Sequence, residues 1–269
     1  MLHHQMPSPD QVQRDPNSEA NTGDYESVGL LLEFSVNFDT KRIYGNAVLK
    51  MKRLTSFDHI HLDASHLDIG KCLINGEEVT FEYDSKGGKF GGLLKVNVGD
   101  SVIVGSQFDL LVKYSTTDGC TGAQWLEAHQ TVGGKHPYMF TQFQAIHARS
   151  VIPCQDTPSS KCVYEATLKV PQGMTALMSA NESTEESPGV FKFKQTVPIP
   201  SYLIAIAVGN IKGKSIGPRS TVWSEPEFLD ACAYEFVDTE EFLTLAESFA
   251  GPYVWGRYDL LVLPGSFPY

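Results

Sequence analysis

Apolar and polar residues alternate along several stretches of this chain, and the first stretch starts near Leu30. Its apolar members are Leu32, Phe34, Val36 and Phe38, and a polar residue stands between each pair. Successive side chains of a β-strand point to opposite faces of the sheet. This period of two therefore predicts a strand with one buried face.

The same alternation returns further along the chain, with turn signals between the stretches. It covers 47–51, 94–98 and 108–114, and further strands are expected at 164–170 and 191–197. Asn75-Gly76 is a pair that two-residue hairpins favour, since both positions need a positive φ. Short strands separated by turns at intervals of about ten residues predict an all-β sandwich or an open barrel.

The pattern changes beyond residue 209. The stretch 210–218 is rich in Lys and Gly and is interpreted as a linker. After it, Phe242, Leu245 and Phe249 recur with the spacing of an amphipathic helix, and Asp238 is the expected N-cap. The sequence thus predicts a β domain followed by a short part that contains helices.

The apolar run 259–263 is bounded by Gly and Pro and predicts a strand that is buried on both faces. Such a strand needs neighbours and covering elements, and none follow before Tyr269. At the other end, residues 1–24 are rich in Pro, Asn, Ser, Asp and Gln and lack the features of a signal peptide. We expect this segment to be a flexible tail.

Charge and cysteine usage exclude some classes of protein. The net charge is −11, which argues against a nucleic-acid partner because phosphate contacts need clustered Lys and Arg. No apolar run is long enough to span a membrane as a helix. The five cysteines are scattered and odd in number, which is typical of reduced thiols and predicts a cytoplasmic protein.

Residue types alone reveal no catalytic centre. His59 and His61 share one strand face and could hold a metal, but a solvent-facing stripe is the more ordinary interpretation. The glycine-rich stretch 85–92 lacks the phosphate-binding pattern and predicts a hairpin loop. The chain contains neither H-E-x-x-H nor G-x-S-x-G.

Long polar side chains interrupt an apolar segment at 138–149, which we interpret as a strand. Gln142 and Gln144 lie two residues apart there, hence on the same face. An amide oxygen can accept hydrogen bonds from an ammonium group without bringing a formal charge. Alternatively, the two amides simply tie a loop to the backbone.

Three blocks of sequence resemble a known family. They are 141–149 (TQFQAIHAR) with 153–158 (PCQDTP), 197–205 (VPIPSYLIA), and 251–264 (GPYVWGRYDLLVLP). They are similar to the zinc metallo-aminopeptidases that carry G-x-M-E-N and H-E-x-x-H motifs, and within these to the leukotriene A4 hydrolase branch. In many other members a Glu stands at the position of Gln144, and Asp-Glu-Pro replaces 156–158.

The resemblance implies a mainly β fold class. A twisted antiparallel β-sheet domain, saddle- or sandwich-like, would occupy 25–212, and 213–269 would be the first α/β elements of a thermolysin-like catalytic domain. The chain would then be the N-terminal portion of the enzyme, ending just before G-x-M-E-N. Zinc would belong to the full-length enzyme, with no catalytic residue or metal ligand in this chain, which alone would be inactive.

The resemblance also implies a substrate and its binding residues. Gln144 would bind the free α-amino group of a peptide, and Gln142 and Tyr269 would line the substrate pocket. The partners expected of the full-length enzyme are peptides with a free N-terminus. A free-standing β domain that acts as a protein-interaction module is the alternative.

Overall fold

An eight-stranded sheet dominates the computed structural model, which describes residues 15–85 and 90–267. All its neighbouring strands are antiparallel except β1 and β11, which are parallel. In spatial order the strands are β13 (Glu182–Ser187), β14 (Val190–Pro200), β11 (Lys161–Lys169), β1 (Tyr25–Asn37), β2 (Arg42–Arg53), β8 (Gln107–Thr116), β4 (Leu67–Ile74) and β5 (Glu77–Val79).

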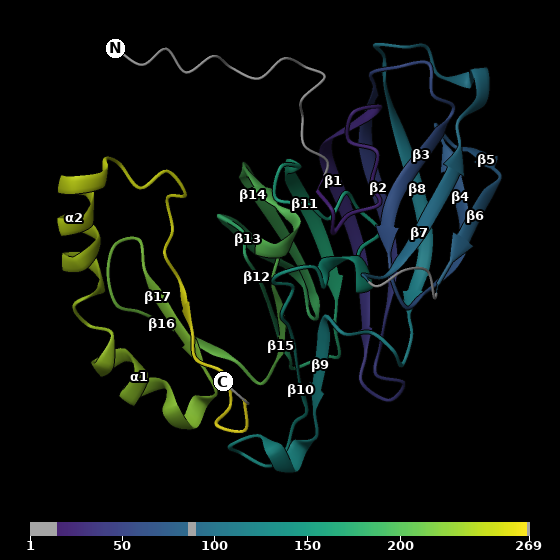
Figure 1. Ribbon diagram of the computed structural model, residues 1–269. Coiled ribbons are helices and arrows are strands. Elements are labelled where there is room, and N and C mark those ends of the chain that lie inside the picture. The colour runs from purple at the N-terminus through teal and green to yellow at the C-terminus, as the bar shows by residue number, and fades with distance from the viewer. Residues whose placement is uncertain (1–14, 86–89, 268–269) are drawn as a thin grey trace.

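A three-stranded sheet contributes to the same core and makes this part a sandwich (Figure 1). Its strands are β3 (His59–Ala64), β7 (Gly92–Asn97) and β6 (Phe81–Asp84). Phe34 of β1 belongs to one buried cluster with Ile60 and Leu94. Each such side chain stabilises the fold by about 1.5–3 kcal/mol when fully buried. The period-two prediction is thus confirmed, and the fold is mainly β.

A third sheet, of four strands, positions the candidate site. Its order is β12 (Thr175–Met178), β15 (Ile206–Gly209), β10 (Tyr138–Thr141) and β9 (Ala123–Leu126). All four residues of β10 are buried, and so are all four of β15. The central pair of this sheet is therefore covered on both faces and gives the loop that follows β10 a rigid base.

The C-terminal part lies beside the four-stranded sheet, away from β2 and β8 (Figure 1). It consists of the sheet β16 (Lys212–Ser215), β17 (Thr221–Ser224) and β18 (Leu260–Leu261), with the helices α1 (Leu229–Glu235) and α2 (Thr239–Ala250). Short 3-10 turns occur at η2 (Gly99–Ser101), η3 (Ala128–Gln130), η4 (Ala148–Ser150), η5 (Ser201–Leu203) and η6 (Pro226–Phe228).

Two local predictions are confirmed. Asn75 and Gly76 both have a positive φ, 50° and 91°, and join β4 to β5 as a hairpin. Asp238 is at the N-cap of α2, but its side chain makes no capping hydrogen bond. The glycine-rich stretch connects the antiparallel strands β6 and β7, as expected of a hairpin loop, although 86–89 lie outside the described residues.

Residues 15–24 pack against the sandwich, whereas a flexible tail was expected up to residue 24. Ser18 and Ala20 are buried. The Asn21 side chain donates to the carbonyl of His59 (3.0 Å) and accepts from the N–H of His61 (2.8 Å). Polar composition concealed this contact because side chain–backbone hydrogen bonds rather than apolar burial hold the segment. The rest of the expected tail, 1–14, lies outside the described residues.

The expected linker at 210–218 is wrong, because β16 lies within it and pairs with β17. All four residues of β16 are exposed, so its sequence shows no apolar–polar alternation that would predict a strand. Gly213 is needed there because a Cβ would come within 2.6 Å of the Trp223 ring. The stretch thus forms a strand through backbone pairing and through the packing of one aromatic ring on a glycine.

The run 259–263 is not buried on both faces in this chain. Its strand, β18, contains two residues and pairs in parallel with β17 alone. Leu260 is half-buried and Leu261 is exposed. No strand among the described residues lies on the other side of β18, and this explains the difference from the prediction.

Candidate functional site

The two glutamines do not share a strand face, contrary to the sequence interpretation. The strand β10 ends at Thr141, where its pairing with β9 ends at Ala123. Gln142 and Gln144 follow in a turn, both exposed, with the buried Phe143 between them. The glutamines lie outside the strand because its partner β9 begins at Ala123, opposite Thr141.

Main-chain and side-chain hydrogen bonds hold the loop after β10 in place. The N–H of Gln142 donates to the carbonyl of Gly122 (2.9 Å), and the N–H of His147 donates to the carbonyl of Phe143 (2.8 Å). In return, the N–H of Gly122 donates to the Ser150 hydroxyl (2.8 Å). A Cβ on Gly122 would lie 2.6 Å from the His147 carbonyl oxygen, so only glycine allows this close approach.

The sequence reading missed Gly122 and Ser150, which hold the loop. Gly122 lies well before the segment 138–149 and Ser150 directly follows it, and neither belongs to a recognisable binding pattern. The available signal was a pair of polar residues around a short turn, with His147 at its N-cap and Ser150 at its last position. The Nδ1 atom of His147 lies 2.8 Å from the Thr121 hydroxyl oxygen and adds a further link to the same neighbouring segment.

The C-terminal described residues approach the same strand. The ring of Phe267 packs edge-on against Phe140 of β10, with 5.0 Å between ring centroids. The Ser266 hydroxyl donates to the carbonyl of Gln130 (2.7 Å). Tyr269, the third predicted site residue, lies outside the described residues. The chain just before it thus returns to β10, close in sequence to Gln142.

An apolar recess borders this region at Thr141. Its volume is about 320 Å³, and it opens between the four-stranded sheet and the C-terminal part. Its walls include Phe140, Met178 and Ile206 on one side and Trp223 and Leu261 on the other. Neither glutamine lines this recess, which lies beside the start of the loop 142–150 that we call the glutamine loop.

The titratable groups nearest β10 are poorly suited to proton transfer. Burial raises the pKa of the Tyr138 hydroxyl far above its ordinary value, and the carboxylate of Glu225 adds to the rise. Glu225 itself is occupied, since both of its carboxylate oxygens accept the N–H of Val132 (3.0 and 3.1 Å). These groups maintain the structure beneath the loop.

Metal ligands do not cluster within 15–85 and 90–267. No group of three or more His, Cys, Asp or Glu side chains there could hold a metal ion. His59 and His61 both project from β3, and Phe57 packs against each ring. His59 Nδ1 also lies 3.3 Å from a carboxylate oxygen of Asp58. The described residues thus do not fit a catalytic zinc ion.

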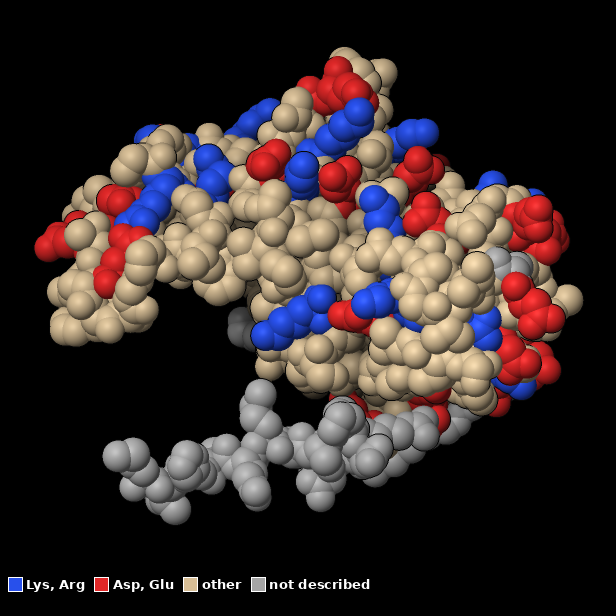
Figure 2. Space-filling model, turned by 90° about the horizontal axis from the view of Figure 1, so that it is seen from above, with Lys and Arg blue, Asp and Glu red and all other residues tan. Residues whose placement is uncertain are grey.

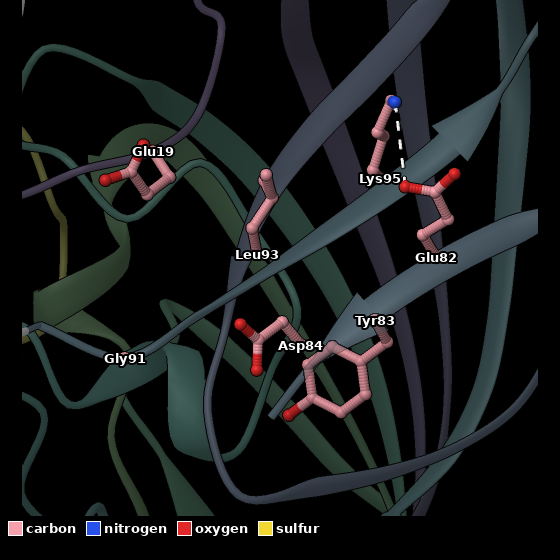
Figure 3. A pocket seen from close by; sticks show the side chains of 7 residues that line it. All are labelled: Glu19, Glu82, Tyr83, Asp84, Gly91, Leu93 and Lys95. Atoms are coloured by element: carbon pink, nitrogen blue, oxygen red, sulfur yellow. Dashed lines mark ion pairs between the residues drawn. The ribbon is translucent and has the colours of Figure 1, made fainter. Parts of the chain in front are cut away.

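A second recess lies at the β6–β7 hairpin and has a volume of about 340 Å³ (Figure 3). An ion pair between Lys95 and Glu82, with a nitrogen–oxygen distance of 3.6 Å, lies in this recess. The Tyr83 hydroxyl accepts the N–H of Leu67 (3.1 Å). Neither glutamine is among the residues that line this recess, and its polar groups do not form a catalytic arrangement.

Fold and sequence together define the class of the protein. The chain belongs to the Peptidase M1 N-terminal domain family, whose profile matches residues 21–203. This confirms the resemblance to the zinc metallo-aminopeptidases.

Individual relatives refine this assignment. The chain is 41% identical over 262 residues to leukotriene A-4 hydrolase of Xenopus laevis. It is 40% identical over 264 residues to leucine aminopeptidase 2 of Aspergillus fumigatus. In each case the match covers 95% of this chain but 43% of the relative. The chain thus spans less than half the length of the curated relatives it matches.

Solved structures show the same relationship. Native leukotriene A4 hydrolase from Saccharomyces cerevisiae superposes with a TM-score of 0.89 at 38% identity, covering 96% of this chain and 40% of that one. An M1 zinc metallopeptidase from Deinococcus radiodurans superposes with a TM-score of 0.71 at 19% identity, over 90% of this chain and 57% of that one. The second likeness shows that the fold is shared.

Proposed function

We propose that this chain is part of a zinc-dependent aminopeptidase similar to leukotriene A4 hydrolase, and that it recognises the free amino terminus of a peptide substrate. The observation that carries the proposal is the loop after β10, which presents Gln142 and Gln144 to solvent from a fixed backbone. The membership of the chain in the M1 family gives this loop a chemical context.

The chemistry of the loop suits an ammonium group. A carboxamide oxygen accepts hydrogen bonds from a cation and stays neutral, so it needs no counter-ion when substrate is absent. A hydrogen bond to a charged group stabilises by about 1.5–3 kcal/mol. Binding the α-ammonium at Gln144 would align the first peptide bond and favour removal of single N-terminal residues. Gln142 and Tyr269 would line the adjoining pocket.

Zinc is the metal that we propose for the full-length enzyme, where it would polarise the first peptide carbonyl. The described residues of this chain supply no ligand set for it. The chain would contribute to substrate binding, and we propose that its β domain ends at 212 and the catalytic domain begins at 213. The alternative of an interaction module is less favoured, since the peptidase relatives match along 95% of the chain.

A cytoplasmic location forms part of the proposal. All five cysteines are free thiols, which is typical of proteins in a reducing compartment. Among the described residues, no helix is both long and apolar enough to cross a membrane. On the face drawn in Figure 2, Lys and Arg side chains are interspersed with Asp and Glu, without the basic patch that a nucleic-acid partner would require.

The test uses the protein encoded by the complete transcript that contains this chain. We expect it to release the N-terminal residue of a peptide and to leave the matched N-acetylated peptide intact, because acetylation removes the ammonium charge. Zinc content and turnover are measured on the same preparation. Equal hydrolysis of both peptides, or no hydrolysis by the zinc-loaded protein, would contradict the proposal.

A further inference from the structure

A buried ionic cluster lies at the C-terminal end of the glutamine loop. Its centre is Arg149, whose side chain is 3% exposed, between the buried carboxylates of Asp63 and Asp156. The Nε atom of Arg149 donates to Asp156 Oδ2 (2.8 Å), and one terminal nitrogen lies 3.6 Å from Asp63 Oδ1. One guanidinium group thus faces two carboxylates away from water.

Hydroxyl and main-chain groups from distant segments complete the cluster. The Ser18 hydroxyl donates to Asp63 (2.6 Å), and the Ser201 hydroxyl donates to Asp156 (2.5 Å). The N–H of Asp156 donates to Asp63 (3.0 Å). We call the five residues Arg149, Asp63, Asp156, Ser18 and Ser201 the Arg149 cluster. It joins the N-terminal segment, β3, the glutamine loop and η5.

A short series of contacts leads from the Arg149 cluster to the glutamines. Arg149 is the middle residue of η4, and the next residue, Ser150, donates its hydroxyl hydrogen to the carbonyl of His147 (2.8 Å). The N–H of His147 in turn donates to the carbonyl of Phe143 (2.8 Å), and Gln144 follows Phe143. A shift of Arg149 would therefore be transmitted to Gln144 through one turn of backbone.

Stability alone is a weak explanation for such a cluster. Desolvation offsets much of the attraction in a buried ion pair, and well-packed apolar residues are often equally stable in its place. Apolar packing does not fix the orientation of neighbouring polar groups, whereas a guanidinium group fixes the angle and distance of each acceptor. Arg149 donates to Asp156 and also to the carbonyl of Phe90 (2.6 Å), so its orientation is fully determined.

We propose that Arg149 is a positioning residue that holds Gln142 and Gln144 at the angle required to bind a peptide ammonium group. This inference rests on the proposed function for the purpose of the glutamines, but the position of the loop can be measured without any activity. The Arg149 cluster would set the geometry of the site without touching substrate, whereas the glutamines would contact it.

Arg53 provides a matched control. It is likewise a buried arginine, 6% exposed, and its guanidinium group donates to the carbonyls of Gly99, Val102, Thr55, Ser56 and Phe57. None of these acceptors belongs to the glutamine loop. Arg53→Met should lower stability without moving Gln142 or Gln144, so it separates general destabilisation from positioning.

The first measurement is amide hydrogen exchange on the isotope-labelled chain. In Arg149→Met we expect exchange at the Gln142 and His147 amides to become about tenfold faster or more relative to the β1 amides, because their local closed state is weakened. Arg53→Met should leave that ratio unchanged. Ser201→Ala removes one bond to Asp156 but keeps the Arg149 cation beside both buried carboxylates, so it tests the same effect if Arg149→Met does not fold.

The second measurement uses the complete enzyme. We expect Arg149→Met or Ser201→Ala to raise KM for peptides with a free N-terminus more than it lowers kcat, and Arg53→Met to change neither. A folded Arg149→Met or Ser201→Ala variant with unchanged loop exchange, or with unchanged KM in an active enzyme, would overturn the inference. If the wild type does not hydrolyse peptides, the proposed function fails, and the exchange result still decides whether Arg149 positions the loop.

Discussion

Gln144 is the residue on which the proposed substrate recognition depends most directly. In the complete enzyme, Gln144→Ala should reduce kcat/KM for peptides with a free N-terminus. The reduction should correspond to a loss of about 1–3 kcal/mol of transition-state stabilisation, the cost of losing a hydrogen bond to a charged group. Gln172→Ala is the control, since Gln172 is an exposed amide in the loop between β11 and β12. Unchanged kinetics in Gln144→Ala would make Gln144 a structural residue.

At the same scale, the sequence located the glutamines but not their geometry. A spacing of two places residues on one face only within a strand, and β10 ends at Thr141. What ends it is distant in sequence, because its partner strand β9 begins only at Ala123, opposite Thr141. Arg149 was not predicted for a related reason, because one of its two carboxylate partners, Asp63, lies on a strand that only the fold brings next to it.

A half-buried arginine, Arg219, bonds to the helix α2. Arg219 donates to Glu240 (2.9 Å) and, through two nitrogens, to Glu247 (2.9 and 2.7 Å). The Glu247 carboxylate also accepts the N–H of Tyr253 (2.8 Å), so it links the helix to the segment that follows. These bonds, with the Arg219 bond first, lower the pKa of Glu247 to about 2 from its ordinary value of 4.5.

A depressed folded-state pKa gives the direction of the pH effect. The contribution of Glu247 to holding α2 is fully present above about pH 4.5 and is lost as the pH falls towards 2. In Arg219→Met, the Glu247 carboxyl should titrate closer to 4.5, as followed by carbon NMR, and α2 should detach at higher pH. Lys214→Met breaks a pair with Asp230 on α1 instead and should leave Glu247 unchanged. A Glu247 pKa that does not respond to Arg219→Met would contradict this assignment.

Elements with a buried face were predictable, and those held only by their backbone were not. The alternation in β1, β2 and β8 reports directly which side faces the core, because burial selects the side chain at every second position. In β16 every side chain is exposed, so the sequence contains no record of the strand. In β18 the apolar residues were recognised, but composition does not show how many strands pair with this one.

Buried apolar side chains are distributed unevenly between the two parts of the molecule. The sandwich residues form one large core, whereas a much smaller cluster joins β10 and β15 to Trp223 and Leu263 of the C-terminal part. The edges of the eight-stranded sheet, β13 and β5, each carry two or more glutamates, which discourage pairing with other chains. The helix α2 also carries three glutamates, Glu240, Glu241 and Glu247, but it still exposes large apolar side chains.

The last prediction concerns this uncovered surface. Phe242, Leu245 and Phe249 of α2 are 66%, 55% and 83% exposed. Contiguous apolar surface of this kind promotes association. We expect the isolated chain to associate with rising concentration in sedimentation experiments, and its α2 amides to exchange faster than those of β1.

Charge on the exposed face of α2 should reverse that behaviour. Because both rings are largely solvated, Phe242→Glu with Phe249→Glu should change stability by no more than about 0.5 kcal/mol for each substitution, while reducing association. Ile103→Glu is the matched control, since Ile103 is 78% exposed on the loop before β8, far along the chain from α2. If Ile103→Glu suppresses association as strongly as the double variant, or if the double variant associates like the wild type, then α2 is not the surface through which the chains associate. Loss of association only in the double variant would identify the apolar face of α2 as its cause.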